Sequence, residues 1–447
     1  MKQPTRARPA LQPAGLLERL PPRQQALIAA ARTVAERQGL AVYLVGGPVR
    51  DLLLGSPSTD LDLAVAGAAL PYANVLAASL GARLTVHPRF GTATLAFQDG
   101  LRLDVATARR ERYPHPAALP QVDAGTIEED LGRRDFTVNA MAVRLDAREE
   151  ELLDPFGGLA DLEAGLLRSL HGTSYRDDPT RILRGARYAA RCRLRFAEQD
   201  RRLIRTALEE GVLRRLSADR LFRELKLLLA ESRPEAALRV LEDLAVLRTL
   251  DPALTFGAVG AAALRGVRRG LKRYRDLGVG AGPPPWRVAL LVLLRAVPVR
   301  VRRRVAGRLG MKGLLLAHVL AELGDLPRLE RQLSQERIRP SRLRRLLDGT
   351  SPEVHLLLWA VSAGRARQRV ERYLTHLASV RPALTGRDFK DLGIPPGPAY
   401  RRIMALLLDG RLEGRLGTRE DEVAFVRHRF GRARPAARRV AREHSAG

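Results

Sequence analysis

Residues 41–65 read AVYLVGGPVRDLLLGSPSTDLDLAV, and this stretch decides the fold of the first part of the chain. A short apolar run ends in a glycine pair at 46–47, a helical stretch follows, and a second alternating run opens with Asp60-Leu61-Asp62. This pattern predicts two β-strands joined by a short helix. Because side chains two positions apart on a strand point to the same face, Asp60 and Asp62 are expected to project together.

Two carboxylates on one strand predict a site for a divalent cation. Like charges a few ångströms apart repel each other, and a cation between them removes that cost. Mg²⁺ prefers hard oxygen ligands and uses one or two carboxylates together with substrate phosphates. Asp104 lies in another strand pattern and could supply a third carboxylate. Three acids, two cations and a polyphosphate match two-metal nucleotidyl transfer, although a lone DxD sequence is more often a surface turn.

The turn between the two strands predicts a phosphate contact. Gly47 lets backbone N–H groups approach an anion closely, and the helix that follows favours negative charge at its N-terminus. Arg50 could clamp phosphate oxygens. The plainer alternative is a strand–turn–helix unit with a surface pair of Arg50 and Asp51.

Strand patterns recur at 93–97 and 101–106, and helical spacing is found at 22–38 and 68–80. After about Leu166 the chain is built of Leu, Ala and Arg at helical spacing, broken by Pro and Gly. We therefore expect an α+β fold, with a small α/β head followed by a long all-α neck, body and tail. The expected divisions are an N-terminal helical extension (1–38), the head (39–165), the neck (166–250), the body (251–380) and a tail with a basic C-terminus (381–447).

The charge balance predicts a polyanionic partner. The 447 residues include 77 Lys and Arg against 49 Asp and Glu, a net charge of +28. Nucleic acid is the first candidate and an acidic membrane the second. The one cysteine, Cys192, excludes an internal disulfide and a cysteine-based metal site. The N-terminus lacks the apolar core of a signal peptide and the run at 288–294 is too short for a bilayer, so a cytoplasmic protein without a membrane partner is expected.

The motifs, taken in order, resemble those of the class II tRNA nucleotidyltransferase and bacterial poly(A) polymerase family, whose heads are polymerase-β-like nucleotidyltransferases. The stretches that carry the resemblance are LVGGPVRDLLLG with TDLDLAV (44–65), DVATARRERY (104–113), EEDLGRRDFTVNAMAV (128–143), LLDPFGGLADL (152–162), DDPTRILRGARYAARCRLRF (177–196) and, more loosely, LTGRDFKDLGIPPGP (384–398). In the neck motif, Tyr188 stands where the family usually has Phe.

The resemblance implies a role for each matching residue. Asp60 and Asp62 would hold the catalytic Mg²⁺, and Gly47 and Arg50 would contact the triphosphate of the incoming nucleotide. Arg134 and Asp135 would bind triphosphate and ribose. Four residues of the neck motif would lie beside the base and the phosphates, namely Asp178, Arg181, Arg184 and Arg187.

The spacing of the neck motif also predicts base recognition. Asp178, Arg181 and Arg184 are three positions apart and hence neighbours on a helix. A carboxylate accepts hydrogen bonds and a guanidinium donates them, so the pair can match the Watson–Crick edge of C or A and refuse U and G. The alternative is an exposed helix with a weak i,i+3 ion pair.

The resemblance implies addition of C and A to tRNA 3′ ends from CTP and ATP. The segment HPRFGTATLAF (87–97) lacks the Gly-Arg-Arg-Phe-like stretch usual in bacterial poly(A) polymerases, which favours tRNA as substrate. Enzymes that add only CC or only A stay open, as does poly(A) synthesis, and so does the oligomeric state. The Arg-rich helices are expected to bind the acceptor stem and elbow through phosphates and shape. The non-enzyme alternative is an RNA-binding protein with an inactive head, against which the intact Asp60, Asp62, Arg50 and Arg134 speak.

Overall fold

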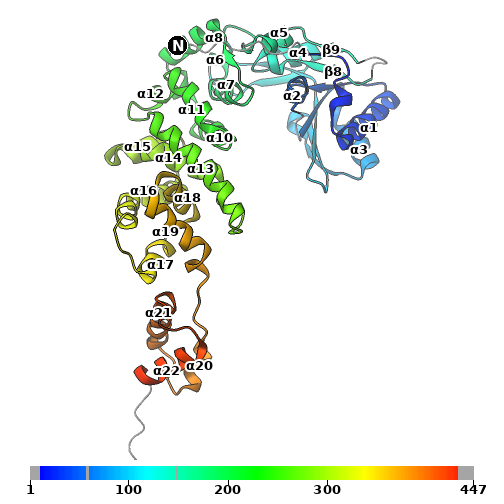
Figure 1. Cartoon of the computed structure of the whole chain (residues 1–447). Helices are drawn as coiled ribbons and strands as arrows, with labels where there is room; N and C mark the ends of the chain where they lie inside the picture. Colours follow the sequence, from blue (N-terminus) through cyan, green and yellow to red (C-terminus); the bar gives the residue numbers. More distant parts are fainter. Residues whose placement is uncertain (1–10, 57–59, 147–149, 431–447) are drawn as a thin grey trace, which may run out of the picture. The chain divides into compact units, whose positions relative to one another are not determined.

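The computed structural model describes residues 11–56, 60–146 and 150–430 (Figure 1). Two compact units are distinguished by their internal contacts: the chain up to Ala262 with Val292–Ala317, and Ala263–Leu291 with the chain from His318 onward. The expected α+β class is confirmed, because a small mixed sheet in the first unit is followed by helices. Within the described ranges, no helix is long and apolar enough to cross a membrane.

The head contains a seven-stranded sheet in the order β3-β4-β5-β2-β1-β8-β9. Strands β2 and β5 are parallel, and the other neighbours are antiparallel. The bounds are β1 (Ala41–Val45), β2 (Asp60–Ala66), β3 (Arg83–His87), β4 (Thr92–Ala96), β5 (Arg102–Thr107), β8 (Ala142–Arg144) and β9 (Leu152–Leu153), and a separate hairpin pairs β6 (Arg109–Arg112) with β7 (Gln121–Ala124).

The four strands expected from the sequence are present, each shifted by no more than about two residues. The sequence reading missed β3, β8, β9 and the β6–β7 hairpin. The reason is that β3 is an edge strand with mostly exposed side chains, β8 and β9 are only three and two residues long, and both hairpin strands are polar and exposed or half-buried.

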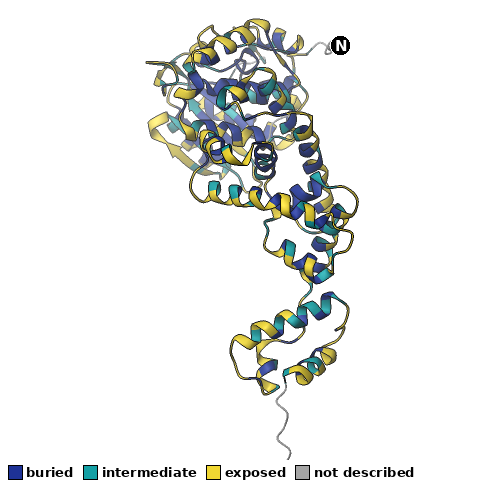
Figure 2. Ribbon diagram, turned by 90° about the vertical axis from the view of Figure 1, so that its left-hand side faces the viewer, coloured by how far each residue is buried: buried dark blue, intermediate teal, exposed yellow. Residues whose placement is uncertain are grey.

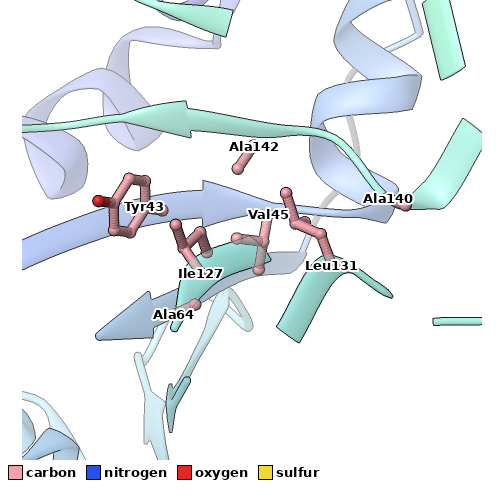
Figure 3. Close-up of a cluster of buried hydrophobic side chains, with 7 residues drawn as sticks. All are labelled: Tyr43, Val45, Ala64, Ile127, Leu131, Ala140 and Ala142. Carbon is pink, nitrogen blue, oxygen red and sulfur yellow. The ribbon is translucent and has the colours of Figure 1, made fainter. Parts of the chain in front are cut away.

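Helices cover both faces of the sheet. Two helices, α1 (Pro22–Gln38) and α3 (Ala69–Leu80), lie side by side, and the Tyr72 hydroxyl of α3 donates to the carbonyl of Ala31 in α1 at 2.8 Å. On the other face, α4 (Ile127–Gly132) begins at a capping box formed by Thr126 and Glu129. Its side chains pack on the sheet in the cluster of Figure 3, which contains Tyr43, Val45, Ala64, Ile127, Leu131, Ala140 and Ala142.

Two shorter connections complete the head. Helix α2 (Gly47–Leu53) follows β1 directly, with Pro48 in its first turn, where the missing N–H of proline costs no hydrogen bond. Helix α5 (Gly158–Glu163) follows β9 and leads into the neck. Gly158 packs so closely on the backbone of Thr137 that no side chain fits there.

The neck is a set of short helices around α7 (Thr180–Arg191). Helices α10 (Ala218–Leu229) and α11 (Pro234–Asp243) both pack on α7. At Gly185 a Cβ atom would lie 2.5 Å from Phe196 and 2.8 Å from Phe136, so glycine lets α7 approach the head. The remaining elements are α6 (Ser174–Asp177), α8 (Glu198–Glu209), α9 (Val212–Arg215), α12 (Val246–Leu250), α15 (Val299–Arg308), β10 (Leu166–Leu167) and β11 (Arg195–Phe196).

The second unit is wholly helical in its described part, and its helices bury one side and expose the other (Figure 2). Three helices contribute residues to both units, namely α13 (Ala258–Asp276), α14 (Pro285–Arg295) and α16 (Gly313–Leu333). The others are α17 (Pro340–Asp348), α18 (Pro352–Val361), α19 (Gly364–Thr375), α20 (Gly386–Asp391), α21 (Pro398–Leu412) and α22 (Arg419–Phe430). Near the C-terminus, the buried Glu422 accepts hydrogen bonds from Arg411 and from the backbone of Ala383 and Leu384.

Candidate active site

Three carboxylates gather on the parallel pair β2 and β5. Asp60 and Asp62 alternate with the buried Leu61, and Asp104 stands opposite Asp62 in the strand register. The hydroxyl of Thr94, on the next strand, donates to Oδ1 of Asp104 at 2.5 Å. Burial, together with the charges of Asp104 and Asp60, raises the pKa of Asp62 to about 6, although Arg134 opposes the shift.

This acidic cluster fits a divalent cation. Burial, and to a smaller extent the charges of Asp104 and Asp60, disfavour the ionised form of Asp62, and a cation beside these carboxylates would offset both effects. Across the described ranges, no group of three His, Cys, Asp or Glu side chains is arranged to hold a metal ion on its own. A cation here would therefore complete its shell with oxygen atoms of a bound phosphate or water, as Mg²⁺ commonly does.

The turn between β1 and α2 places a buried arginine beside the acids. Gly46 has φ 75°, and a Cβ atom there would collide with the guanidinium of Arg134. Arg50, only 2% exposed, donates from Nε and Nη2 to Oδ1 of Asp51 at 2.8 and 2.7 Å, and from Nη1 to the side chain of Asn139. Its guanidinium also lies over the ring of Tyr188, 5.0 Å from the ring centre.

The C-terminal end of α4 supplies two more cations. Nη2 of Arg133 and Nη2 of Arg134 donate to the two oxygens of Asp130 at 2.7 and 2.9 Å. Burial would raise the pKa of Asp130, but the two arginines hold it below its usual range. Nε of Arg134 is buried and finds no acceptor within the described residues, so a donor remains for an anionic ligand.

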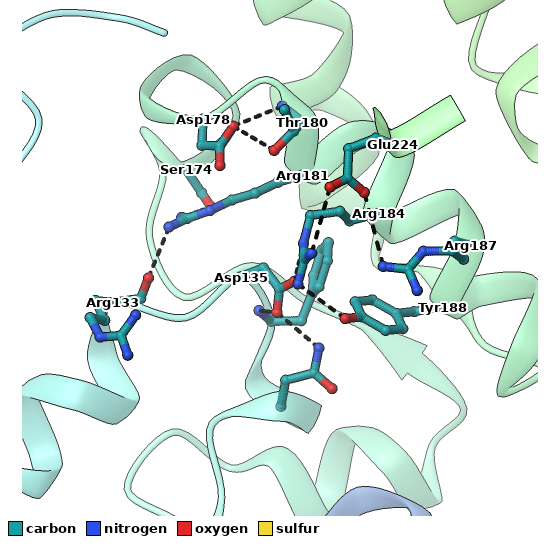
Figure 4. A network of polar contacts seen from close by, with 12 residues as sticks. Arg133, Asp135, Ser174, Asp178, Thr180, Arg181, Arg184, Arg187, Tyr188 and Glu224 are labelled. Atoms are coloured by element: carbon teal, nitrogen blue, oxygen red, sulfur yellow. Dashed lines mark hydrogen bonds and ion pairs between the residues drawn. The ribbon is translucent and has the colours of Figure 1, made fainter. Parts of the chain in front are cut away.

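Asp135 joins the head to the neck, as Figure 4 shows. Its Oδ1 accepts from the side chain of Asn139 at 2.8 Å, and its Oδ2 accepts from Nε of Arg184 at 2.9 Å. Nη2 of Arg184 donates to the hydroxyl of Tyr188 at 3.1 Å. Burial would raise the pKa of Asp135, but Arg184 and Asn139 hold it below its usual value.

The other neck residues lie around the start of α7. Arg181 and Arg184 lie on this helix as the spacing predicts, but Asp178 precedes it in extended backbone, two residues before its first turn. Oδ1 of Asp178 accepts from the backbone and hydroxyl of Thr180 at 2.9 and 2.6 Å. Arg181 is 4% exposed, and its Nη1 donates to the hydroxyl of Ser174 at 2.6 Å while its Nη2 donates to the carbonyl of Arg133 at 2.9 Å. Both side chains of the expected base-reading pair are therefore held in place before any ligand binds (Figure 4).

One open cleft of about 470 Å³ brings these groups together. Ten of the eleven residues singled out from the sequence line it; the exception is Arg187, which lies behind the cleft against Glu224 at 4.0 Å and Glu231 at 3.7 Å. Arg187 does reach the face of Tyr188, 4.9 Å from the ring centre. The lining residues that the sequence reading did not assign are Pro48, Asp51, Glu111, Tyr113, Arg133, Asn139, Tyr188 and Arg191.

Some of these missed residues carried a signal. Arg133 and Asn139 stand inside the same family-like motif, 128–143, that contains Arg134 and Asp135. Glu111 and Tyr113 reach the cleft only because the β6–β7 hairpin folds back toward α4, and no local pattern predicts that pairing.

The sheet and the cleft define a nucleotidyltransferase, and comparison with known proteins specifies the kind. A family model described as "Poly A polymerase head domain" matches residues 42–168. The chain is 34% identical to the A-adding tRNA nucleotidyltransferase of Halalkalibacterium halodurans, covering 90% of this chain and 92% of that one. It is 36% identical to the CC-adding tRNA nucleotidyltransferase of Deinococcus radiodurans, covering 88% and 90%. The chain therefore belongs to the tRNA nucleotidyltransferase family.

Further relatives agree with this placement. The A-adding tRNA nucleotidyltransferase of Geobacter sulfurreducens is 35% identical, but the chain spans only 46% of its length. Among solved structures, an apo CCA-adding enzyme is 32% identical with a TM-score of 0.77, covering 92% of this chain and 97% of that one. The Thermotoga maritima CCA-adding enzyme complexed with tRNA is 30% identical with a TM-score of 0.72, covering 92% and 96%.

Proposed function

We propose that this protein is a template-independent, cytoplasmic tRNA nucleotidyltransferase that adds C, A or both to tRNA 3′ ends from CTP and ATP with Mg²⁺. The observation that carries the proposal is the single cleft in which Asp60, Asp62 and Asp104 face an arginine-rich wall and the start of α7. The acids fit a metal, the arginines fit a triphosphate and α7 fits a base. The relatives' names supply tRNA as the acceptor.

The arginines would bind the triphosphate. Arg50 and Arg134 line the cleft beside the acids, and each is already fixed by a neighbouring carboxylate, Asp51 or Asp130. Guanidinium groups bind phosphate oxygens through paired N–H donors, and donors fixed in advance lose little entropy when a ligand binds. The Nε of Arg134 is the donor that such a ligand would satisfy.

The carboxylates would hold the metal ion at the atoms that react. Asp60 and Asp62 would hold Mg²⁺, which when bound lowers the pKa of the attacking 3′-hydroxyl and neutralises charge on the phosphates. Asp104, opposite Asp62 on the next strand, would serve as a third carboxylate, and Thr94 fixes the direction of one of its oxygens. The hydroxyl would lose its proton to water, its oxygen would bond to the α-phosphorus while the bond to pyrophosphate breaks, and the arginines would stabilise the charge of the departing pyrophosphate.

The start of α7 would choose the base. Asp178 and Arg181 line the cleft and are fixed by Thr180, Ser174 and the carbonyl of Arg133. Oδ2 of Asp178 receives no donor among the described residues, so it would be able to accept from the exocyclic amine of C or A. A keto oxygen of U or G at that place would face a carboxylate and be repelled.

The experiment that tests the proposal uses three tRNA substrates, ending before CCA, after C and after CC, each incubated with labelled CTP or ATP and Mg²⁺. Addition of C to the first two and of A to the third shows the complete reaction. No addition to any of them, in a preparation that binds tRNA, would leave an RNA-binding protein with an inactive head. Long tails of A on all three would indicate poly(A) synthesis.

An enzyme that adds only A, or only CC, is the second candidate, and the names of the relatives favour it. The Halalkalibacterium and Geobacter enzymes are both A-adding, at 34% and 35% identity. If this chain adds A to the third substrate and leaves the first two unchanged, the A-adding assignment replaces the complete one. The reverse pattern would assign CC addition.

A further inference from the structure

Arg220 stands outside every motif discussed above, yet its side chain touches the proposed base-reading carboxylate. It lies in the first turn of α10, where Ser217 caps the helix by accepting from the backbone N–H of Arg220 at 3.4 Å. Its side chain is three-quarters buried, with 25% exposure. The guanidinium reaches from α10 to the start of α7.

The two ends of this guanidinium hold two different parts of the molecule. Nη2 donates to Oδ1 of Asp178 at 2.8 Å, and Nη1 donates to the carbonyl of Ala117 at 2.9 Å. Ala117 belongs to residues 113–120, which connect β6 and β7. A planar guanidinium can span two acceptors at once with fixed geometry, which the single point charge of lysine cannot do.

The connecting segment is also fixed from the other side of the same residue. The backbone N–H of Ala117 donates to the carbonyls of Arg176 and Asp177, at 3.0 and 3.2 Å, immediately before Asp178. Ala117 has φ +63°, one of three positive values among the described non-glycine residues. Such a conformation costs free energy and persists only where the surroundings enforce it. Here the contacts that enforce it all lead to Asp178 or its neighbours.

These contacts determine which oxygen of Asp178 can meet a ligand. Oδ1 accepts three hydrogen bonds, two from Thr180 and one from Arg220. Thr180 is the near neighbour of Asp178 in the chain, whereas Arg220 comes from another helix and prevents the carboxylate from swinging with the loop that carries it. Oδ2 is then the oxygen that remains for a base in the cleft.

The same face of α10 also contacts charged side chains further along α7. Glu224, one turn after Arg220, lies 3.9 Å from Arg184 and 4.0 Å from Arg187. A cation of α10, Arg220, therefore meets the acid that precedes α7, and an acid of α10, Glu224, meets two cations on α7. This match indicates that α10 fixes the polar side chains of α7 and does not only bury its apolar face.

We propose that Arg220 is a positioning residue for base selection. It holds the carboxylate of Asp178 so that Oδ2 stays available to the nucleotide, and through Ala117 it ties the orientation of that carboxylate to the 113–120 segment. The inference rests on the proposed function, because it takes Asp178 to read the base. Without Arg220, the carboxylate can turn, so an amine on the base loses its acceptor while a keto oxygen loses its repulsion.

The test compares wild type, R220A, R220K and R223A with all four nucleotides on the tRNA substrate that the wild type extends. Arg223 is an exposed arginine of the same helix and serves as the matched control. The readouts are kcat/KM for each nucleotide and the melting temperature. We expect R220A to lower the preference for the accepted nucleotide over UTP and GTP about tenfold or more and, because two hydrogen bonds are lost, to lower the melting temperature by a few degrees. We expect R220K to fall between, and R223A to match wild type in both readouts.

The outcomes separate the inference from the function on which it rests. If the wild type extends no tRNA, the proposed function fails. If the wild type is active and R220A keeps its full preference, or slows all four nucleotides equally, the role of Arg220 in base selection is wrong. A fully wild-type R220K would overturn the requirement for a guanidinium that spans both acceptors.

Discussion

Arg184 donates from Nε to Oδ2 of Asp135 at 2.9 Å, and this contact ties the neck to the head at the floor of the cleft. Asp135 is 7% exposed, and its other oxygen is bound by Asn139. Around this pair, Tyr188 lies under three guanidinium groups, those of Arg50, Arg184 and Arg187. The carboxylate of Asp135 and the ring of Tyr188 offset the repulsion among these positively charged guanidinium groups.

The first prediction concerns this pair. D135N keeps the shape of the side chain but removes the charge that balances Arg184, so we expect the free energy of unfolding of the first unit to fall by about 1–3 kcal/mol at pH 7. Because the folded pKa of Asp135 is lowered, its contribution is complete above the ordinary pKa of 3.8 and is lost as the pH falls through the folded value.

Denaturant unfolding of wild type and D135N at pH 7 and at pH 3 measures both parts of this prediction. The difference between the two proteins should narrow at the lower pH. An equal difference at both pH values would show that the charge of Asp135 does not stabilise the fold, and D243N, at an exposed acid of α11, provides the comparison.

The second prediction concerns the proposed metal ligands. D60A should remove nucleotide addition while tRNA affinity stays near that of wild type, because Asp60 lies at the exposed start of β2 and its loss should disturb little packing. A gel-based addition assay and a tRNA binding assay, run on the same preparation, measure the two effects. Full addition by D60A would contradict the metal assignment. D123N, at an exposed acid of β7 outside the cleft lining, is the control.

The third prediction concerns Arg181. R181A should lower the preference for CTP and ATP over UTP and GTP, because it removes the guanidinium that in the proposed function would donate to the ring nitrogen of C or A. Loss of its hydrogen bonds to Ser174 and to the carbonyl of Arg133 should also lower the melting temperature by a few degrees. Kinetics with the four nucleotides and a thermal melt measure both, with R195A as an exposed control in the same unit. An unchanged preference would remove Arg181 from base selection.

The sequence was informative where chemistry and local pattern coincide. The DxD spacing predicted two carboxylates on one face of a strand, and the structure places both in one cleft with Asp104 opposite Asp62. Helical spacing predicted α7, but spacing alone made Arg187 equivalent to Arg184. The structure separates them, because the position of α10 turns Arg187 toward Glu224 and Glu231.

What the sequence did not predict depends on contacts between distant segments. Arg220 reaches Asp178 across 42 positions, and Ala117 across 103. Its helix carries no motif, and an arginine in a helix of this basic chain is ordinary. Pairing of the β6–β7 hairpin, which brings Glu111 to Arg133 at 2.9 Å, is equally non-local. Such contacts follow from how distant segments pack together, and the periodicity of a sequence does not predict that packing.

The fourth prediction concerns binding of tRNA by the second unit. A pocket of about 490 Å³ between the start of α17 and the end of α21 is lined by five exposed arginines against two acids, and the residues are Arg337, Arg339, Arg342, Arg345, Arg415, Asp409 and Glu413. Asp409 is paired with Arg345 at 2.7 Å, and Glu413 accepts from the backbone and hydroxyl of Ser341. The excess of cations suits phosphate groups of RNA.

Contacts to phosphates release counterions, so tRNA affinity should fall steeply as salt rises, and each lost phosphate contact should reduce the slope of log affinity against log salt by about one. We expect the double variant R342Q/R415Q to bind tRNA more weakly at low salt and to show a slope smaller by about two. Binding titrations at several salt concentrations measure this, with R19Q/R37Q, two arginines of the first unit that line none of the pockets described, as the charge-matched control. A slope equal to that of wild type would mean that these arginines do not meet phosphates, whatever the net charge of the chain.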